Sequence, residues 1–289
     1  MSNTDQCWPA PGKLNLFLHI TGQREDGYHT LQTIFQFIGL SDQLRIRINA
    51  QGEISTRHQL AGISTADDLS VKAARLLQRQ TGCRQGADIE LIKNLPIGGG
   101  VGGGSSDAAT TLLVLNHLWA TGLTRDELVT LGLQLGADVP VFIHGNACWA
   151  EGVGEHLEDV ILPEPAYLVI YPNIHVSTGA IFSAGELTRN TPPIRIADFL
   201  AGQAGNKRPG NDCEAVVRRQ VAEVDAAMRW LEQFASPRLT GTGACVFAEF
   251  ESTGAAEEVA SQCTNNWQTF VTQGYNRSPL HKLLDGQGN

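Results

Sequence analysis

Residues 96–107 read PIGGGVGGGSSD, with glycine at six of the seven positions from 98 to 104. The stretch follows a predicted strand around Ile89–Leu91 and precedes a predicted helix that begins near Ala108. Because glycine loses the most backbone entropy on folding, so many glycines in one loop indicate positive φ angles or close approach to a ligand. Backbone N–H groups in such a loop, next to a helix N-terminus, form a site for an anion. We therefore interpret the stretch as a phosphate-binding loop rather than a flexible or tightly packed connection.

The glycine spacing leaves more than one interpretation of the anion. The P-loop pattern is absent because the loop contains no lysine. Gly98-x-Gly100-x-x-Gly103 satisfies the dinucleotide fingerprint, but the acid expected about 20 residues later falls where a helix begins, at Asp126. A dinucleotide site, as in a nicotinamide-dependent oxidoreductase, is therefore a weak interpretation of the loop, and a non-enzymatic anion-binding module is the least favoured one. Ser105, Ser106 or Asp107 would be metal contacts if a divalent cation accompanies the phosphates.

The composition is that of a soluble globular protein, with 42% apolar and 18% charged residues. At 289 residues we expect two domains. The net charge of −9, without a basic stripe, argues against nucleic acid or an anionic membrane as a partner. The six cysteines are scattered and the N-terminus has no signal-peptide pattern, so we expect free thiols and a cytoplasmic location.

Apolar patterns predict a coarse order of elements, with a domain boundary near residues 155–165, where Pro163 and Pro165 lie. A second domain is expected to begin with the strand Leu168–Tyr171. The further predicted elements are strands at 13–20 and 44–48, helices at 65–80 and 212–234, a helix opened by the capping box Thr124-x-x-Glu127, and a glycine turn leading into a strand at 239–247.

Lys13 and Asp138 are candidates for chemistry. Lys13 and Asn15 share one face of the first strand, where lysine is uncommon, although Lys13 could also be an exposed residue of an edge strand. Asp138 is the only acidic residue between Glu127 and Glu151, and an ionised carboxylate among apolar neighbours needs a partner. Alternatively, it caps the turn or helix that follows it.

Gly27-Tyr28-His29 follows a predicted turn. An adjacent phenol and imidazole can stack on a flat base and form hydrogen bonds with it. The alternative is that the pair only anchors the loop. The other histidines show no spacing typical of a metal site.

Four stretches together resemble the motif series of the GHMP kinase superfamily, which includes galactokinase, homoserine kinase and mevalonate kinase. A fifth, residues 21–33, resembles the branch of that superfamily whose substrate is 4-diphosphocytidyl-2-C-methyl-D-erythritol. The resemblance covers about residues 8–281. It departs at Gly12 and Gly99, where alanine is usual, and at Asp68, where asparagine is frequent. The four stretches are residues 11–16, 98–107, 135–140 and 239–244.

This resemblance implies an α+β, two-domain GHMP kinase fold, with residues 1–160 like the second domain of ribosomal protein S5 and residues 161–289 ferredoxin-like. It implies an active site in the cleft between them. It also implies ATP- and Mg²⁺-dependent phosphorylation of the 2-hydroxyl of a small molecule that carries cytidine diphosphate, in non-mevalonate isoprenoid synthesis. A homoserine- or mevalonate-type kinase is the alternative within the superfamily. We expect no nucleic-acid or membrane partner, and a monomer or weak homodimer.

The resemblance also assigns roles to individual residues. The catalytic pair falls on Lys13 and Asp138. Substrate binding falls on Asn15, Tyr28, His29, Thr178 and Phe182, with Phe182 as the second face of a sandwich around the cytosine. The ATP-phosphate loop comprises Pro96, Ile97, Gly98, Gly99, Gly100, Val101, Gly102, Gly103, Gly104, Ser105 and Ser106. Whether Gly241 and Gly243 contact a ligand or only turn the chain stays open.

Overall fold

The structure is a computed structural model that describes residues 6–58, 63–201 and 209–286. Its strands are β1 (Cys7–Gln23), β2 (His29–Asn49), β3 (Ile54–Thr56), β4 (Gly86–Ile92), β5 (Cys148–Glu151), β6 (His156–Asp159), β7 (Ala166–Tyr171), β8 (Arg238–Leu239), β9 (Val246–Phe250) and β10 (Gln268–Tyr275). Its helices are α1 (Leu69–Thr81), α2 (Gly103–Leu118), α3 (Arg125–Leu133), α4 (Val139–His144), α5 (Thr178–Ser183), α6 (Ile196–Leu200), α7 (Glu214–Gln220), α8 (Ala222–Leu231), α9 (Thr253–Ser261) and α10 (Pro279–Asp285).

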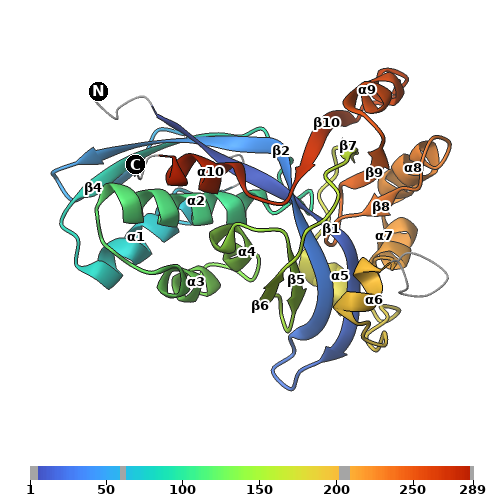
Figure 1. The fold of residues 1–289 in the computed structure, drawn as a ribbon, viewed down its shortest axis with the longest axis horizontal. Helices are drawn as coiled ribbons and strands as arrows, with labels where there is room; N and C mark the ends of the chain where they lie inside the picture. Colours follow the sequence, from blue (N-terminus) through green and yellow to red (C-terminus); the bar gives the residue numbers. More distant parts are fainter. Residues whose placement is uncertain (1–5, 59–62, 202–208, 287–289) are drawn as a thin grey trace.

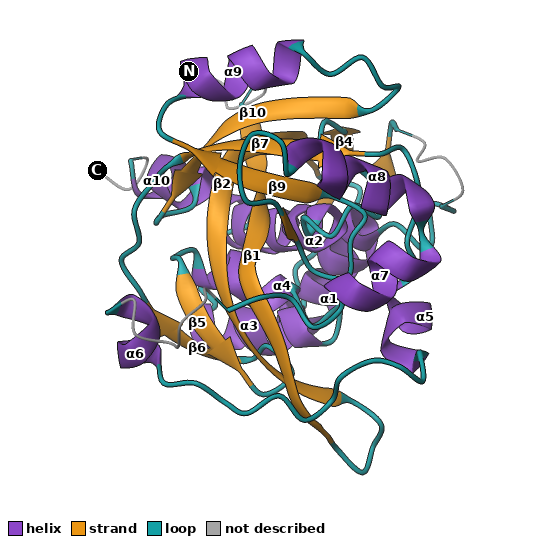
Figure 2. Ribbon diagram, turned by 90° about the vertical axis from the view of Figure 1, so that its right-hand side faces the viewer, coloured by secondary structure: helices purple, strands orange, loops and turns teal. Residues whose placement is uncertain are grey.

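One hydrogen-bonded network connects strands from both ends of the chain. Its order is β3-β4-β2-β10-β7-β9-β8, and β1 and the β5–β6 hairpin also pair with β2. The long strands β1 and β2 run side by side through the middle of the molecule (Figure 2). β10 joins the two parts, because it pairs with β7 along its length and with β2 at Gly274 and Tyr275.

Helices cover the two parts of the sheet separately. Helices α1–α4 lie against the part that contains β2 and β4, and α7–α9 lie beside β7–β9 (Figure 1). The first group buries a core that includes Phe37, Leu77 and Leu115, and Leu280 of α10 packs into the same core. The last helix of the chain therefore completes the core that its first strands begin.

Two further apolar clusters occur among the described residues. One lies between β7, β9 and helices α7 and α8, and includes Val217 and Met228. The other joins both parts of the chain, because Leu14 of β1 and Val101 of the glycine loop pack with Phe247 of β9. This shared cluster fixes the loop between the two parts of the molecule.

The predicted strands and the capping box are confirmed. Thr124 accepts a hydrogen bond from the Glu127 backbone N–H at 3.3 Å, and Glu127 Oε2 accepts one from Thr124 N at 2.8 Å. The helix predicted at 65–80 begins later, at Leu69. The reason is that Asp68 is the N-cap, and its side chain accepts a hydrogen bond from Ser70 N at 2.8 Å.

The single helix predicted at 212–234 is wrong. The chain forms α7 and α8, which are separated at Val221, where φ is −128° and ψ is 93°. Arg218 spans the break, with Nε 2.7 Å from Asp225 Oδ1 and Nη1 2.8 Å from Glu232 Oε1. The apolar spacing continued through the break because both helices bury residues in the same cluster, and spacing does not report whether the backbone ladder is continuous.

No helix in residues 6–58, 63–201 and 209–286 combines the length and the apolar character needed to cross a membrane.

Candidate active site

A cavity of about 870 Å³ collects residues from distant parts of the chain. Its walls come from β1, the β1–β2 hairpin, the glycine loop, the start of α4, α5 and the turn after β8. It brings together the predicted pair and every predicted substrate residue, with part of the loop. These lining residues are Lys13, Asn15, Tyr28, His29, Gly100, Ser105, Asp138, Thr178 and Phe182.

Lys13 is a buried residue of β1, with 2% of its surface exposed. The alternative of an exposed edge lysine is therefore wrong. The glycine loop covers the strand here, because Lys13 N donates to Val101 O at 3.0 Å. The ammonium donates to Asn15 Oδ1 at 2.5 Å and to Gly100 O at 3.1 Å, and it lies 3.4 Å from Asp138 Oδ2. These contacts aim the cation into the cavity between the loop and the carboxylate.

Asp138 occupies the N-cap position of α4, as the alternative interpretation expected, but its side chain makes no capping hydrogen bond. The carboxylate instead faces Lys13, and its side chain is 41% exposed. A carboxylate that is paired with a cation and open to the cavity can accept a proton from a bound hydroxyl.

Asn15 is held by the strand beside it. Its Nδ2 donates to Thr33 Oγ1 at 2.9 Å, so its Oδ1 faces the Lys13 ammonium. Its backbone N–H donates to Thr240 Oγ1 at 3.0 Å, which ties β1 to the turn after β8.

The glycine loop packs closely on that same turn. Gly100 has a φ of +78°, and a Cβ at this position would lie 2.3 Å from Thr240 O. Cys245 N also donates to Gly99 O at 2.9 Å. Glycine is needed at position 100 for both the backbone angle and the close approach. The loop is thus held on two sides, by β1 and by the turn.

Only some of the predicted loop residues reach the cavity. Gly100 and Ser105 line it, whereas Val101 and Ser106 are fully buried and Ile97 is 46% exposed. Helix α2 begins at Gly103, with Gly102 as its N-cap and no side-chain cap, so neither serine caps it. The first N–H groups of the helix have no intrahelical partners and are available to an anion.

The dinucleotide interpretation of the glycines is wrong. β4, the strand before the loop, pairs antiparallel with β2, with Leu91 opposite Leu44. β5, the first strand after the loop, also pairs antiparallel with β2. β4 and β5 therefore do not pair with each other, whereas a dinucleotide fingerprint lies between two parallel strands of a βαβ unit that is built into one parallel sheet.

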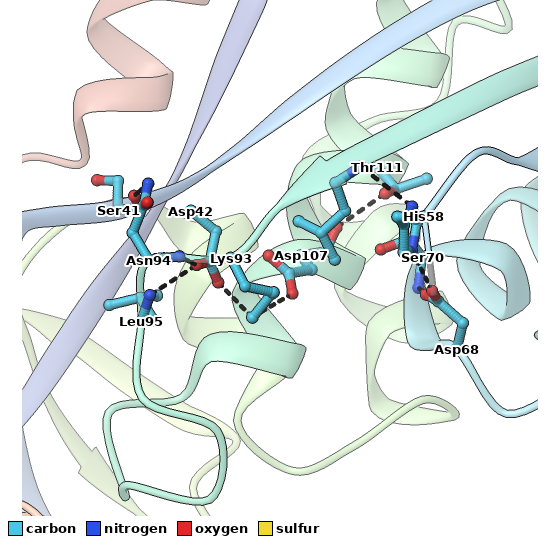
Figure 3. Close-up of polar contacts among 11 residues, drawn as sticks. Ser41, Asp42, His58, Asp68, Ser70, Lys93, Asn94, Leu95, Asp107 and Thr111 are labelled. Carbon is cyan, nitrogen blue, oxygen red and sulfur yellow. Dashed lines mark hydrogen bonds and ion pairs between the residues drawn. The ribbon is translucent and has the colours of Figure 1, made fainter. Parts of the chain in front are cut away.

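A buried charged cluster lies behind the loop and ties its two ends together (Figure 3). Lys93 Nζ contacts Asp42 Oδ2 and lies 2.8 Å from Asp107 Oδ2. Asp42 Oδ1 accepts hydrogen bonds from the backbone N–H groups of Asn94 at 2.6 Å and Leu95 at 2.7 Å. The residues before Pro96 and the first turn of α2 are therefore attached to one lysine and to β2.

The charges of this cluster do not balance, since two carboxylates share one ammonium. Burial raises the pKa of Asp107, and the nearby Asp42 carboxylate adds to the rise, against the effect of Lys93. Burial alone would lower the pKa of Lys93, but the two carboxylates outweigh it and raise that pKa. Asp107 does not line the cavity, so its carboxylate serves the loop's framework more directly than a ligand.

Both carboxylate oxygens of Asp68, one of the positions where the sequence departs from the resemblance, contact other protein groups (Figure 3). Its Oδ1 caps α1 through Ser70 N, and its Oδ2 lies 2.6 Å from His58 Nε2. His58 Nδ1 accepts a hydrogen bond from Leu91 N at 3.1 Å, so the ring proton is on Nε2 and is donated to Asp68. This carboxylate fastens α1 to the segment after β3.

The aromatic residues lie at the other end of the cavity. The rings of His29 and Phe182 stack, with centroids 5.1 Å apart and planes 26° apart. The two rings are in direct contact, so a base cannot enter between them. Tyr28 is 64% exposed at the hairpin tip and lines the same end. Burial and the positive charge of Arg189 lower the pKa of His29.

Sequence reasoning missed several residues of this region. Arg189 and Thr242 line the cavity, and Thr242 Oγ1 lies 2.9 Å from Thr178 Oγ1. Arg189 follows α5 in a segment without a periodic pattern, so no sequence signal identified it. Gly241 lines the cavity, whereas Gly243 is not among the lining residues and packs toward Leu239.

Two family models match the chain. Residues 68–146 match the GHMP kinases N terminal domain, and residues 196–269 match the GHMP kinases C terminal domain. These segments include the glycine loop and Asp138 in the first case, and the turn at Thr240 in the second.

Relatives that match nearly the whole chain carry one name, 4-diphosphocytidyl-2-C-methyl-D-erythritol kinase. The protein of that name from Dechloromonas aromatica (strain RCB) is 53% identical over 277 residues, which cover 96% of this chain and 99% of that protein. The one from Azoarcus sp. (strain BH72) is also 53% identical over 277 residues, which cover 96% of each chain.

Solved structures of kinases have the same fold as this chain. A crystal structure of 4-(cytidine 5'-diphospho)-2C-methyl-D-erythritol kinase superposes with a TM-score of 0.82 at 29% identity, covering 93% of this chain and 99% of that one. A mevalonate kinase superposes with a TM-score of 0.69 at 14% identity, covering 94% and 100%, which shows a shared fold alone. The predicted α+β GHMP kinase fold is confirmed, and the chain belongs to the GHMP kinase family, within its branch of 4-diphosphocytidyl-2-C-methyl-D-erythritol kinases.

Proposed function

We propose that the protein transfers the γ-phosphoryl group of ATP to the 2-hydroxyl of 4-diphosphocytidyl-2-C-methyl-D-erythritol, giving the 2-phosphate and ADP, as a step of non-mevalonate isoprenoid synthesis. The observation that carries this proposal is the placement of the Lys13–Asp138 pair between the glycine loop and the aromatic end of one cavity. A phosphate donor at the loop and a base at the aromatic end would bring the hydroxyl and the γ-phosphate to this pair.

In the proposed step, Asp138 accepts the proton of the attacking hydroxyl. The hydroxyl oxygen forms a bond to the γ-phosphorus while the bond from that phosphorus to the bridging oxygen breaks, and the electron pair leaves with ADP. Lys13, 3.4 Å from the carboxylate, stabilises the negative charge on the transferring group. Phosphoryl transfer needs mainly positioning and charge stabilisation, so the fixed geometry of both side chains matters as much as proton removal.

Mg²⁺ fits the loop as a companion of the triphosphate. Ser106 Oγ is buried and has no hydrogen-bond partner among the described residues, and Mg²⁺ prefers oxygen ligands while retaining several waters. Ser105, which lines the cavity, would hold the ion, and the buried Ser106 hydroxyl would reach it only through a water. When bound, it would neutralise phosphate charge. The loop N–H groups and the N-terminus of α2 would bind the phosphate oxygens.

The aromatic end supports the cytidine part of the proposal. We propose that Tyr28 and Phe182 stack on the cytosine and that His29 forms hydrogen bonds with its edge, with Asn15 and Thr178 along the rest of the substrate. Homoserine and mevalonate contain no ring that would need such a surface. The relatives at 53% identity also favour the cytidyl substrate over these alternatives.

The test is ADP release from ATP–Mg²⁺ with the cytidyl substrate, homoserine, mevalonate or no acceptor. We expect release with the cytidyl substrate alone. Release with another acceptor would keep the kinase and discard its proposed substrate. Asp138→Asn should bind ATP normally and lose about 10²–10⁴-fold in kcat, whereas Asp126→Asn, on the exposed start of α3, should match the parent enzyme. Full activity of Asp138→Asn would remove the carboxylate from the mechanism.

We also propose a domain division near residue 160, with α10 returning to the core of the first domain, a cytoplasmic location and a monomer or weak homodimer. The six cysteines are free thiols, which fits a reducing compartment. Sedimentation at two protein concentrations would measure the oligomeric state.

A further inference from the structure

Arg189 is held rigidly at the aromatic end of the cavity. Its Nη2 donates to the backbone carbonyls of Phe182 and Ala184, both at 2.8 Å, and its Nη1 donates to Leu187 O at 3.1 Å. These carbonyls lie at the end of α5 and in the turn after it. With both terminal nitrogens bound, the remaining Nε–H points at the His29 ring, 3.0 Å from Nε2.

That contact determines which nitrogen of His29 carries the proton. A guanidinium has only donors and stays protonated, so His29 Nε2 must accept through its lone pair. A neutral imidazole has a single N–H, which is then on Nδ1. A second ring proton is disfavoured as well, because burial and the Arg189 charge lower the pKa of His29.

The Nδ1–H group is available to a ligand. The His29 ring lines the cavity, and among the described residues Nδ1 has no hydrogen-bond partner. One face of the ring is covered by Phe182, whose backbone carbonyl is bound by the same arginine. Arg189 therefore fixes the orientation of the imidazole, the helix end that carries its stacking partner, and the position of the ring proton.

We propose that Arg189 is a positioning residue that makes His29 an Nδ1–H donor and thereby selects a base with a hydrogen-bond acceptor on the facing edge. The inference rests on the proposed function, in which that base is cytosine. Cytosine presents O2 and an unprotonated N3, both acceptors. Uracil carries a proton on N3, which would oppose the His29 donor and leave both donors without acceptors.

Without Arg189, His29 could move its proton to Nε2 and expose a lone pair at Nδ1. The ring would then accept the N3–H of uracil, and the preference for cytosine would weaken. A purely structural role for Arg189 predicts something different, namely weaker binding of both bases with an unchanged ratio. The ratio of affinities thus separates the two roles.

The first measurement is a ¹⁵N–¹H correlation spectrum of the histidine side chains in the free full-length protein. We expect the Nδ1–H pattern for His29 in the parent and loss of that pattern in Arg189→Met. Arg229→Met is the matched control, because Arg229 lies on α8 with its side chain 73% exposed, and it should leave the His29 signals unchanged. A protonated Nε2 in the parent protein would overturn the inference.

The second measurement is the affinity for cytidine diphosphate and uridine diphosphate. The parent should prefer the cytosine nucleotide by about tenfold or more, and Arg189→Met should lose most of that ratio while keeping its affinity for ATP. With the complete substrate, KM should rise in Arg189→Met and kcat should change little. Equal binding of both nucleotides by the parent, or an unchanged ratio in the variant, would refute the role.

These results separate this inference from the proposed function. Selective cytidine diphosphate binding without phosphorylation of any acceptor would reject the function and keep the role of Arg189. Phosphorylation of the cytidyl substrate by a protein that binds cytidine diphosphate and uridine diphosphate equally would keep the function and reject the role of Arg189. If Arg189→Met unfolds, Arg189→Lys keeps a donor and a charge but not the fork geometry, and it should show an intermediate loss of the affinity ratio.

Discussion

Replacing Lys93 with methionine is expected to destabilise the protein by about 4 kcal/mol at pH 7. Asp107→Asn, at the other side of the same contact, is expected to cause no loss. Methionine removes the ammonium that contacts both carboxylates and keeps an unbranched stem. The Asp42 side chain, which is fully buried, then either remains charged without a cation or takes up a proton.

Both routes lead to a similar cost. Removing one partner of a buried ion pair costs about 3–5 kcal/mol. Protonating a carboxyl with an ordinary pKa of about 3.9 at pH 7 costs roughly 1.4 kcal/mol for each of about three pH units, again near 4 kcal/mol. At pH 5 the same proton costs about 1.5 kcal/mol. The loss in free energy of unfolding caused by Lys93→Met should therefore become smaller as the pH falls, because the folded variant binds more protons than its unfolded chain.

Asp107→Asn behaves differently because burial and Asp42 already raise the pKa of Asp107. The amide is neutral and has nearly the same shape, so it removes a charge that the site disfavours.

The assay is urea unfolding of the parent and both variants at pH 7 and pH 5, followed by tryptophan fluorescence, together with KM for ATP. Because the cluster holds both ends of the glycine loop, Lys93→Met should also raise the KM for ATP. A Lys93→Met deficit below about 1 kcal/mol at pH 7, or one that ignores pH, would refute the reasoning. So would an Asp107→Asn variant as unstable as Lys93→Met.

Two further predictions concern packing and pH. Gly100→Ala places a Cβ 2.3 Å from Thr240 O at a φ of +78°, so it should cost about 2 kcal/mol or more and weaken ATP binding. Gly254→Ala on α9, whose Cβ would meet only Ser252 Oγ at 3.9 Å, is the control in the same unfolding and binding assays, and equal losses would contradict the loop geometry. For His281, burial lowers the pKa to about 4, so the unfolded chain binds the extra proton below about pH 6.5. The parent should lose about 2 kcal/mol relative to His281→Gln between pH 7 and pH 5 in urea unfolding, and parallel pH profiles would contradict this.

The residues of the site that could be predicted from the sequence are those that lie in short local motifs. Six glycines between a strand and a helix indicate an anion loop through backbone physics alone. Lys13 on a strand and Asp138 among apolar residues are locally unusual, and this alone identifies both residues as candidates for chemistry. Their meeting at 3.4 Å could be expected only through the family resemblance.

The parts that sequence reasoning missed depend on long-range pairing. Asp42, Lys93 and Asp107 are ordinary charged residues until β2, β4 and α2 pack together and exclude water from them. Arg189 lies in an irregular segment, and its role follows from carbonyls that happen to surround it. The break at Val221 could not be predicted because apolar periodicity reports burial, and residues of both helices are buried in the same apolar cluster.

The return of the chain's end to its beginning has a consequence for biosynthesis. A ribosome releases the chain from the N-terminus at about 5–20 residues per second. β2 lacks its pairing with β10, and the first core lacks Leu280, until those last elements have emerged. The segment with the phosphate loop is therefore translated well before β10 and α10, which complete the sheet and the core around it. Nascent chains paused before Pro279 should remain sensitive to protease. Emergence of residues 268–285, rather than of the first 160 residues, sets the earliest moment at which these native contacts can form.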